Sequence, residues 1–276
     1  MSSQFPGLEW IEPDWPASAR VRALSTLRGG GVSGTPFESL NLGGHAGDAA
    51  AAVSENRRRL RTAAGLPGEP CWLRQVHGRN VADLDADPGG TAAPGAAAAP
   101  GAAAAPGTTA APGGGAVADA SFTRQPGRIC CILTADCLPL LLRSDSGDVV
   151  AAAHAGWRGL AAGVIEATVQ ALKVAPETLM AWLGPAIGPQ HFEVGPEVRE
   201  AMLEGDSGSF AAFVPNARGR LMADLGLLAR RRLLALGIGR IYGGGECTFE
   251  AAERYFSHRR DGATGRQATL IWQLPR

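Results

Sequence analysis

Residues 130–160 read CCILTADCLPLLLRSDSGDVVAAAHAGWRGL, and this stretch decides the fold. An apolar run over residues 132–143 meets a polar turn at 144–147, and a second apolar run follows at 148–153. Apolar runs bounded by serine, aspartate and glycine are typical of buried strands joined by a turn. The stretch therefore predicts an antiparallel hairpin at the centre of the protein.

The turn of this hairpin predicts which residues lie opposite one another. If it is centred after Asp145, Arg143 pairs with Asp148, and Cys137 pairs with His154 in the same register. Directly opposed Cβ atoms lie about 4.5–5.5 Å apart. This separation suits a thiolate and an imidazole that bind one metal ion, so we expect Cys137 and His154 to lie together.

The segment after His154 predicts a helix whose start could bind an anion. Residues 160–172 repeat apolar side chains at helical spacing, and this face consists of Leu160, Val164, Ile165, Thr168, Val169 and Leu172. A glycine-containing turn before a helix exposes backbone N–H groups that bind anions, and Arg158 can add a bidentate contact to phosphate. The alternative is a buried hairpin with an inert cysteine and a histidine satisfied within the core.

Composition excludes several classes of protein. The chain has 276 residues, 45% of them hydrophobic and 19% charged, and 26 basic residues balance 26 acidic ones. This balance does not favour a nucleic-acid partner or an anionic membrane, and no apolar stretch is long enough for a membrane span. The first ten residues do not form a signal peptide. The cysteines are odd in number and lack a disulfide framework, which favours the reducing cytoplasm: Cys71, Cys130, Cys131, Cys137 and Cys247.

The remaining segments predict strands and helices in mixed order. Strands are expected at 20–27, 70–77 and 180–184, and helices at 48–65 and 225–236. They do not follow a regular βαβ repeat, so we expect a single α+β domain over residues 1–276, built as a layered α/β sandwich with a mixed sheet. The arginines at 57–61 are expected on a solvated helix face, from which one could point to the site.

Residues 88–115 form a low-complexity tract of alanine, proline and glycine. Without charges or large apolar side chains, it cannot offset its ordering entropy by burial. We expect a disordered surface insertion between two strands. Replacing it with a short Gly-Ser turn should leave the melting temperature and activity nearly unchanged, because loop entropy grows slowly with length. A large loss of either would show that the tract packs on the domain.

Several motifs, in the same order, resemble one family. The motifs are LNLGGHAGD (40–48), ENRRRL (55–60), LRQVHG (73–78), ADCLPLLL (135–142), HAGWRGL (154–160), LGPAIGP (183–189), CT (247–248) and FSHRRDGATGR (256–266). They resemble the peptidoglycan editing factor family, also described as multicopper polyphenol oxidase-like ("laccase domain") and as purine nucleoside phosphorylase. His258 is a small departure, because tyrosine is commoner at this position of the motif.

The resemblance implies a fold related to the cytotoxic-necrotising-factor-like cysteine hydrolases and a metal site at His77, Cys137 and His154. Two histidines and one cysteine leave a fourth position open, the pattern of a catalytic zinc site; copper is a second candidate metal. The family implies phosphate-dependent cleavage of adenosine and inosine, with methylthioadenosine as a further substrate. Adenosine deamination is a companion activity that activated water would support. Arg158 and Asn41 are our candidates for binding the substrate phosphate.

Three other functions remain open from the sequence. Cys137 could be a thiol nucleophile, with His154 as its base, in a hydrolase that edits peptidoglycan precursors. A copper-dependent polyphenol oxidase would need more histidines than the five present, which are His45, His77, His154, His191 and His258. A scaffold without catalytic activity is disfavoured by the open coordination position and by Arg158. The oligomeric state is left open.

Overall fold

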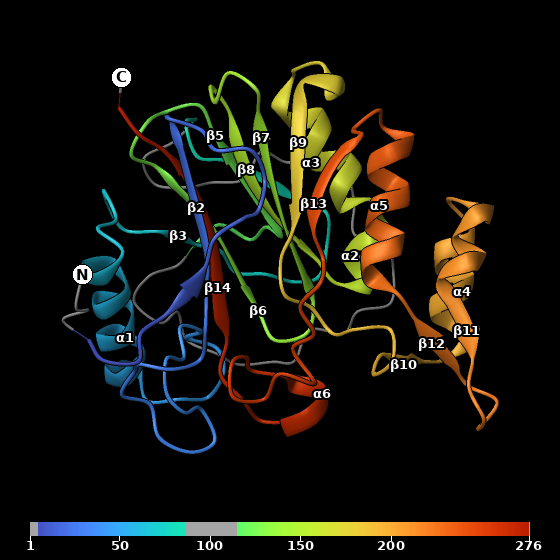
Figure 1. Cartoon of the computed structure of the whole chain (residues 1–276), viewed down its shortest axis with the longest axis horizontal. Helices are drawn as coiled ribbons and strands as arrows, with labels where there is room; N and C mark the ends of the chain where they lie inside the picture. The colour runs from blue at the N-terminus through green and yellow to red at the C-terminus, as the bar shows by residue number, and fades with distance from the viewer. Residues whose placement is uncertain (1–4, 87–114, 276) are drawn as a thin grey trace.

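Two mixed β-sheets stacked face to face form the centre of the protein (Figure 1). The computed structural model describes residues 5–86 and 115–275. The predicted insertion at 88–115 lies outside the described residues except for Gly115. Helix α1 (Ala50–Ala63) covers one side of the stack, and α2 (Trp157–Ala162), α3 (Val164–Leu172) and α5 (Leu225–Ala235) cover the other. This arrangement confirms a layered mixed α/β sandwich.

The strand order places the central hairpin inside the larger sheet. The six-stranded sheet has the order β13 (Arg240–Gly243), β9 (Leu179–Leu183), β7 (Leu138–Ser144), β8 (Val150–Ala155), β5 (Ala120–Thr123) and β4 (Val81–Asp83). The five-stranded sheet has the order β1 (Trp10–Ile11), β2 (Val21–Thr26), β14 (Gln267–Gln273), β6 (Ile129–Thr134) and β3 (Cys71–Trp72). In both sheets antiparallel pairs dominate, with parallel pairs at the margins: β13 with β9, β5 with β4, and β6 with β3.

A smaller unit is inserted in the sequence of the sandwich, between β9 and α5. It contains β10 (Glu193–Val194), α4 (Pro196–Leu203), β11 (Phe213–Pro215) and β12 (Leu221–Ala223). Short 3-10 turns lie at Pro176–Thr178 and Ser207–Ala212, and α6 (His258–Asp261) is a single turn before β14. None of the helices in the described part of the chain has the length and apolarity needed to cross a membrane.

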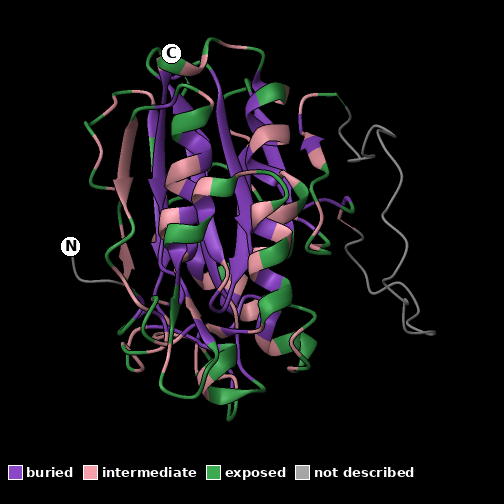
Figure 2. Cartoon of the chain, turned by 90° about the vertical axis from the view of Figure 1, so that its right-hand side faces the viewer, coloured by how far each residue is buried: buried purple, intermediate pink, exposed green. Residues whose placement is uncertain are grey.

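The strands are buried on both faces, which explains their nearly continuous apolar sequences. In β6, Cys130 and Ile132 face the core between the two sheets, whereas Cys131 and Leu133 face the core beneath α1. This is the alternation expected of a strand, and it confirms that both neighbouring cysteines are core residues. Figure 2 shows the central strands almost wholly buried, with exposed residues on the outer faces of the helices and in the loops.

The predicted first strand of the hairpin is in fact two strands in different sheets. Residues 129–134 belong to β6, and residues 138–144 belong to β7. Asp136 lies between them with φ of 91°, a conformation that non-glycine residues seldom adopt. The chain turns at this point from one sheet to the other, which a continuous apolar pattern does not reveal.

The hairpin itself is confirmed, but its predicted register is wrong by two residues. Pro139 pairs with His154 and Arg143 with Val150, because the turn is longer than expected and closes with the Ser144 N–H on the Val149 carbonyl at 3.1 Å. Side chains alternate with a period of two, so a shift of two residues leaves every side chain on its predicted face. The carboxylate of Asp148 contacts Arg20 instead of Arg143.

The helix expected at 160–172 is interrupted. Gly163 has φ of 86° and separates α2 from α3, a left-handed conformation that glycine adopts without steric cost. All six residues of the predicted apolar face are nevertheless buried. Because of this break, α2, which carries Arg158, does not continue the axis of α3 as it would in a single straight helix.

Candidate active site

Two histidines and one cysteine meet at one end of the two-sheet sandwich. His77 follows β3, Cys137 immediately precedes β7, and His154 lies near the end of β8. Their ligand atoms all lie within 4.8 Å of one another. Cys137 Sγ is 3.9 Å from His77 Nε2, and the two imidazole rings are 4.8 Å apart between centroids. The structure therefore brings together all three residues predicted as metal ligands.

A buried carboxylate, Asp119, holds both histidines of this cluster. Its Oδ1 is 2.9 Å from His154 Nδ1, which leaves the other ring nitrogen of His154 for a metal. The same carboxylate accepts backbone N–H groups from Val76, His77 and Gly78 at 3.1, 2.8 and 2.7 Å. These bonds hold His77 at its unusual φ of 60°. A carboxylate behind a ligating histidine is the common outer partner in metal sites.

Close packing against Cys137 explains one glycine of the HAGWRG motif. A Cβ atom on Gly156 would lie 2.7 Å from Cys137 Sγ and 3.4 Å from His77 Cδ2. A real side chain there would have to displace the thiol. Gly156 also precedes α2 in extended backbone, so it ends the strand and leaves room for the thiol at the same position.

The electrostatics of the cluster favour an ionised thiol. Burial raises the pKa of Cys137, but the charge of His154 and hydrogen bonds from both histidines outweigh this and lower it to about 6. Burial lowers the pKa of His154, but the Cys137 thiolate and the Asp119 carboxylate outweigh it and raise that pKa to about 9. Without a metal, the pair is thus a thiolate and an imidazolium. A metal ion would take the place of the imidazolium proton.

The donor set fits a zinc ion. A thiolate and two imidazoles are ligands that zinc prefers, and three protein ligands leave a position for water or substrate. His77 is exposed, Cys137 is half-buried and His154 is buried, so the cluster opens to solvent on one side. The site consequently has the access that a catalytic metal needs and the outer-sphere support that Asp119 supplies.

Two basic side chains from distant segments, Arg266 and His45, lie near the cluster, and Arg57 lies near His45. The negative Cys137 thiolate lies close enough to Arg266 to raise its pKa, although burial lowers it more. Burial, then Arg266 and Arg57, lower the pKa of His45, with smaller contributions from both site histidines. Arg57 donates to the Leu42 carbonyl at 2.9 Å. The site is thus bordered by the guanidinium of Arg266 and by His45, whose lowered pKa favours the neutral imidazole.

Asn41 fixes the loop of residues 41–48, which carries His45, next to Arg266. It is fully buried, and its Oδ1 accepts the backbone N–H groups of Gly43 and Arg266 at 3.0 and 2.9 Å. Its Nδ2 donates to Asp48 at 3.0 Å. The geometry favours a role in fixing the loop next to Arg266, and a direct contact between Asn41 and substrate stays a prediction.

Arg158 lies two residues beyond Gly156, on the first turn of α2. Its side chain is exposed, and its guanidinium lies 4.3 Å from the centroid of the Trp157 ring. In the described part of the chain it forms no hydrogen bond or ion pair. Its donors are therefore available to a ligand, as the sequence predicts.

Asp119, Arg266 and His45 were not recognised from sequence as residues of the site. Asp119 lies in AVADASFT, directly before β5, and its only local sign is a lone carboxylate in a run of small and apolar residues. Such a residue is almost never fully buried unless it is paired, and this signal could have identified it. Arg266 and His45 carry no comparable signal, because only the tertiary fold brings them to the cluster.

Replacing Asp119 with asparagine should weaken zinc binding about 10–100-fold, because the ring of His154 loses the partner that orients it. Competition with a chromophoric chelator measures this affinity. Asp85→Asn is the matched control, since Asp85 accepts hydrogen bonds from Thr123 and Arg124 at the opposite end of β5. Equal zinc affinities for Asp119→Asn and wild type, with both folded, would exclude this role.

The fold and the site together define a class: a layered mixed α/β protein with a candidate metal site of two histidines and one cysteine. The family model described as multi-copper polyphenol oxidoreductase laccase matches residues 22–274. The chain belongs to this family, which confirms the resemblance seen in its motifs.

Curated relatives and a solved structure are similar over almost the whole chain. A purine nucleoside phosphorylase of Pseudomonas aeruginosa is 51% identical, over 95% of this chain and 98% of its own. The purine nucleoside phosphorylase YfiH of Escherichia coli is 46% identical, over 96% and 98%. The crystal structure of Neisseria meningitidis protein NMB0706 superposes with a TM-score of 0.84 at 42% identity, covering 96% of this chain and 99% of that one.

Proposed function

We propose that the protein is a zinc-dependent purine nucleoside phosphorylase that also deaminates adenosine. The observation that carries the proposal is the convergence of His77, Cys137 and His154 in a solvent-accessible cluster beside Arg266. The names of relatives at 46–51% identity supply the substrate class. Adenosine and inosine are the proposed substrates, with methylthioadenosine as a further candidate.

The metal ligands in this proposal are His77, Cys137 and His154. Zinc, when bound, supplies Lewis acidity and lowers the pKa of water, which is the chemistry needed to replace the 6-amino group of adenosine with oxygen. Asp119 keeps the proton on Nδ1 of His154, so that Nε2 faces the metal. The negative charge of Cys137 and the neighbouring Arg266 balance one another at the edge of the site.

Phosphorolysis places further demands on the protein's own side chains. An oxygen of phosphate forms a bond to C1′ of ribose while the bond from C1′ to N9 breaks, and the purine leaves with the electron pair and takes up a proton. We propose that Arg158 holds the phosphate through its free donors, while Arg57 and Arg266 add positive potential. The lowered pKa of His45 favours its neutral form. In that form its ring can donate a hydrogen bond to the nucleoside or accept one from it.

The experiment compares the products of adenosine with and without phosphate. With phosphate, chromatography should show adenine from phosphorolysis together with inosine and hypoxanthine from deamination. Without phosphate, inosine alone should accumulate. Free bases formed at equal rates in both conditions would indicate a hydrolase and would exclude phosphorolysis.

One specific observation favours a thiol hydrolase as the second candidate. Cys137, His154 and Asp119 have the order of a nucleophile, a base and a residue that orients the base, as in cysteine hydrolases. This order also fits the proposed relation to the cytotoxic-necrotising-factor-like fold. His77 favours the metal instead, because a second imidazole beside the thiol has no place in that mechanism. Cleavage of a peptidoglycan precursor by metal-free protein would establish the hydrolase.

We further propose that the protein works in the cytoplasm, where thiols remain reduced. All five cysteines are free. The description of the family suggests a polyphenol oxidase, but His45 and His258 lie outside the two groups of candidate metal ligands found among the described residues. Copper at the Cys137 cluster is therefore a possible substitution for zinc and not the set of sites that multicopper oxidation requires.

A further inference from the structure

A second group of potential metal ligands lies outside the candidate active site. It consists of His191, Cys247 and Glu250, whose ligand atoms lie within 4.8 Å of one another. His191 Nε2 and Glu250 Oε1 are 2.8 Å apart. Cys247 belongs to the CT motif, to which neither the metal triad nor the phosphate contacts assign a role. An imidazole, a thiol and a carboxylate at such distances form a mixed N, S and O donor set.

The cysteine of this group is held at a fixed position by a neighbouring loop. Ala186 and Cys247 form an isolated parallel bridge, in which the Thr248 N–H donates to the Ala186 carbonyl at 3.0 Å. The Gly188 N–H donates to Cys247 Sγ at 3.2 Å, and a Cβ on Gly188 would lie only 3.1 Å from that sulfur. Glycine therefore allows the backbone to approach the thiol, and its N–H fixes the position of the sulfur.

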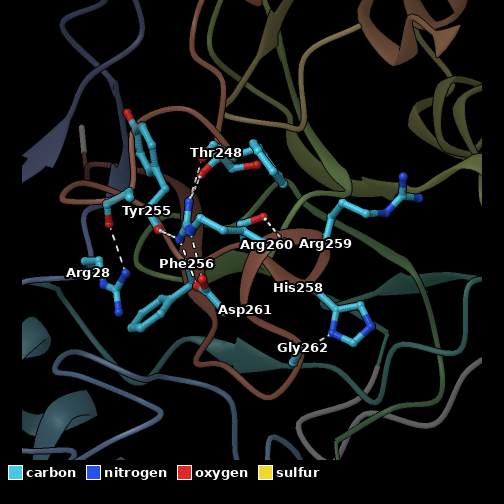
Figure 3. A network of polar contacts seen from close by, with 12 residues as sticks. Arg28, Thr248, Tyr255, Phe256, His258, Arg259, Arg260, Asp261 and Gly262 are labelled. Atoms are coloured by element: carbon cyan, nitrogen blue, oxygen red, sulfur yellow. Dashed lines mark hydrogen bonds and ion pairs between the residues drawn. The ribbon is translucent and has the colours of Figure 1, made fainter. Parts of the chain in front are cut away.

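The other two ligands come from the same pair of loops. The His191 ring stacks on Phe249, with centroids 4.4 Å apart and planes at 13°. The Arg260 guanidinium donates to the carbonyls of Thr248 and Phe249 at 2.7 and 2.9 Å (Figure 3). These contacts fix the segment that carries Cys247 and Glu250 before any ligand arrives. Sites held in this way bind metal without a large ordering cost.

We propose that His191, Cys247 and Glu250 bind a divalent cation of borderline softness, such as Zn²⁺, at a site separate from Cys137. The metal would take the place of the direct contact between His191 Nε2 and Glu250 Oε1. Side-chain exposure of 27% for His191 and 55% for Glu250 gives an ion access from solvent. Protein groups supply three ligands, and water completes the coordination.

This second site would tie together two loops at the border of the candidate active site. The hydroxyl of Thr248, next to Cys247, donates to the carboxylate of Asp136 at 2.7 Å. Asp136 in turn precedes Cys137 and also accepts the Arg259 N–H at 2.6 Å. A metal bound at Cys247 would thereby make the hydrogen bonds that hold the turn at Asp136 and Cys137 more rigid. This structural role does not depend on the proposed reaction.

Alkylation by iodoacetamide, mapped by peptide mass spectrometry on the full chain, tests the proposal at the level of one residue. Added Zn²⁺ should slow alkylation of Cys247 at least about 10-fold, because a metal-bound thiolate is blocked. Cys71 is the control: it is half-buried like Cys247 and belongs to neither ligand group, so its rate should not change. An unchanged rate at Cys247 would overturn the proposal.

Variants separate this site from the first one. In a Cys137→Ala background, zinc should still bind at Cys247, and protection should be lost in His191→Ala and weakened in Glu250→Gln. Glu250 is exposed, so its substitution tests the site even if a change at His191 disturbs folding. Protection that persists in both variants would show that zinc acts elsewhere. Rapid alkylation of Cys247 despite bound zinc would indicate a free reactive thiol and would equally contradict the proposal.

Discussion

Replacing Cys137 with alanine is expected to remove the metal of the active site and abolish both phosphorolysis and deamination. The thiolate is the only anionic ligand of the His77–Cys137–His154 group, and two neutral imidazoles alone bind zinc much more weakly. Loss of the thiolate also removes one of the two negative charges that raise the pKa of His154 and leaves only that of Asp119.

Elemental analysis after gel filtration measures this effect. Zinc should fall by about one ion per chain in Cys137→Ala, the loss expected for one closed set of protein ligands. Cys71→Ala is the matched control, because Cys71 is also half-buried but lies in β3, away from the cluster, and its metal content should equal that of wild type. Unchanged zinc in folded Cys137→Ala would exclude the assignment.

Replacing Arg158 with alanine should reduce phosphorolysis about 10²–10³-fold, the usual cost of removing one donor to a developing charge. Deamination should stay near the wild-type rate, because water replaces phosphate as the second reactant. The side chain is exposed and stacks only on Trp157, so folding should be unaffected, as for most surface substitutions.

The comparison of the phosphorolysis and deamination rates distinguishes a phosphate contact of Arg158 from a structural role. Both activities are followed on adenosine in the same samples, with phosphate varied to separate the effects on kcat and KM. Arg61→Ala, an exposed arginine of α1 in the layer on the opposite side of the protein, provides the control and should leave both rates unchanged. An equal loss of both activities in Arg158→Ala would make the arginine a structural residue.

Much of the fold could be predicted because the decisive information is local. The hairpin, the buried helix face and the period-two alternation all follow from residues close together in sequence. The register was wrong because turn length depends on how Ser144 closes the loop, yet the error was two residues and kept Cys137 and His154 on one face. The break at Asp136 was missed, because apolar residues continue on both sides of it.

The sequence predicted only those residues of the site that lie in recognisable motifs. His77, Cys137 and His154 were found because each lies in a recognisable motif. Asp119 was missed because it contacts His154 through pairing between β5 and β8, and its neighbours show no spacing that indicates chemistry. Arg266 reaches the site through a hydrogen bond to Asn41, a residue remote in sequence. Contacts of this kind arise only when the two sheets come together.

Phosphorus NMR of the wild-type protein with inosine and phosphate tests the central claim most directly. The account predicts a new sugar-phosphate resonance that grows as inorganic phosphate declines, with one ribose 1-phosphate formed for each hypoxanthine released. Hypoxanthine released with free ribose and an unchanged phosphate signal, or the absence of any base release, would contradict it.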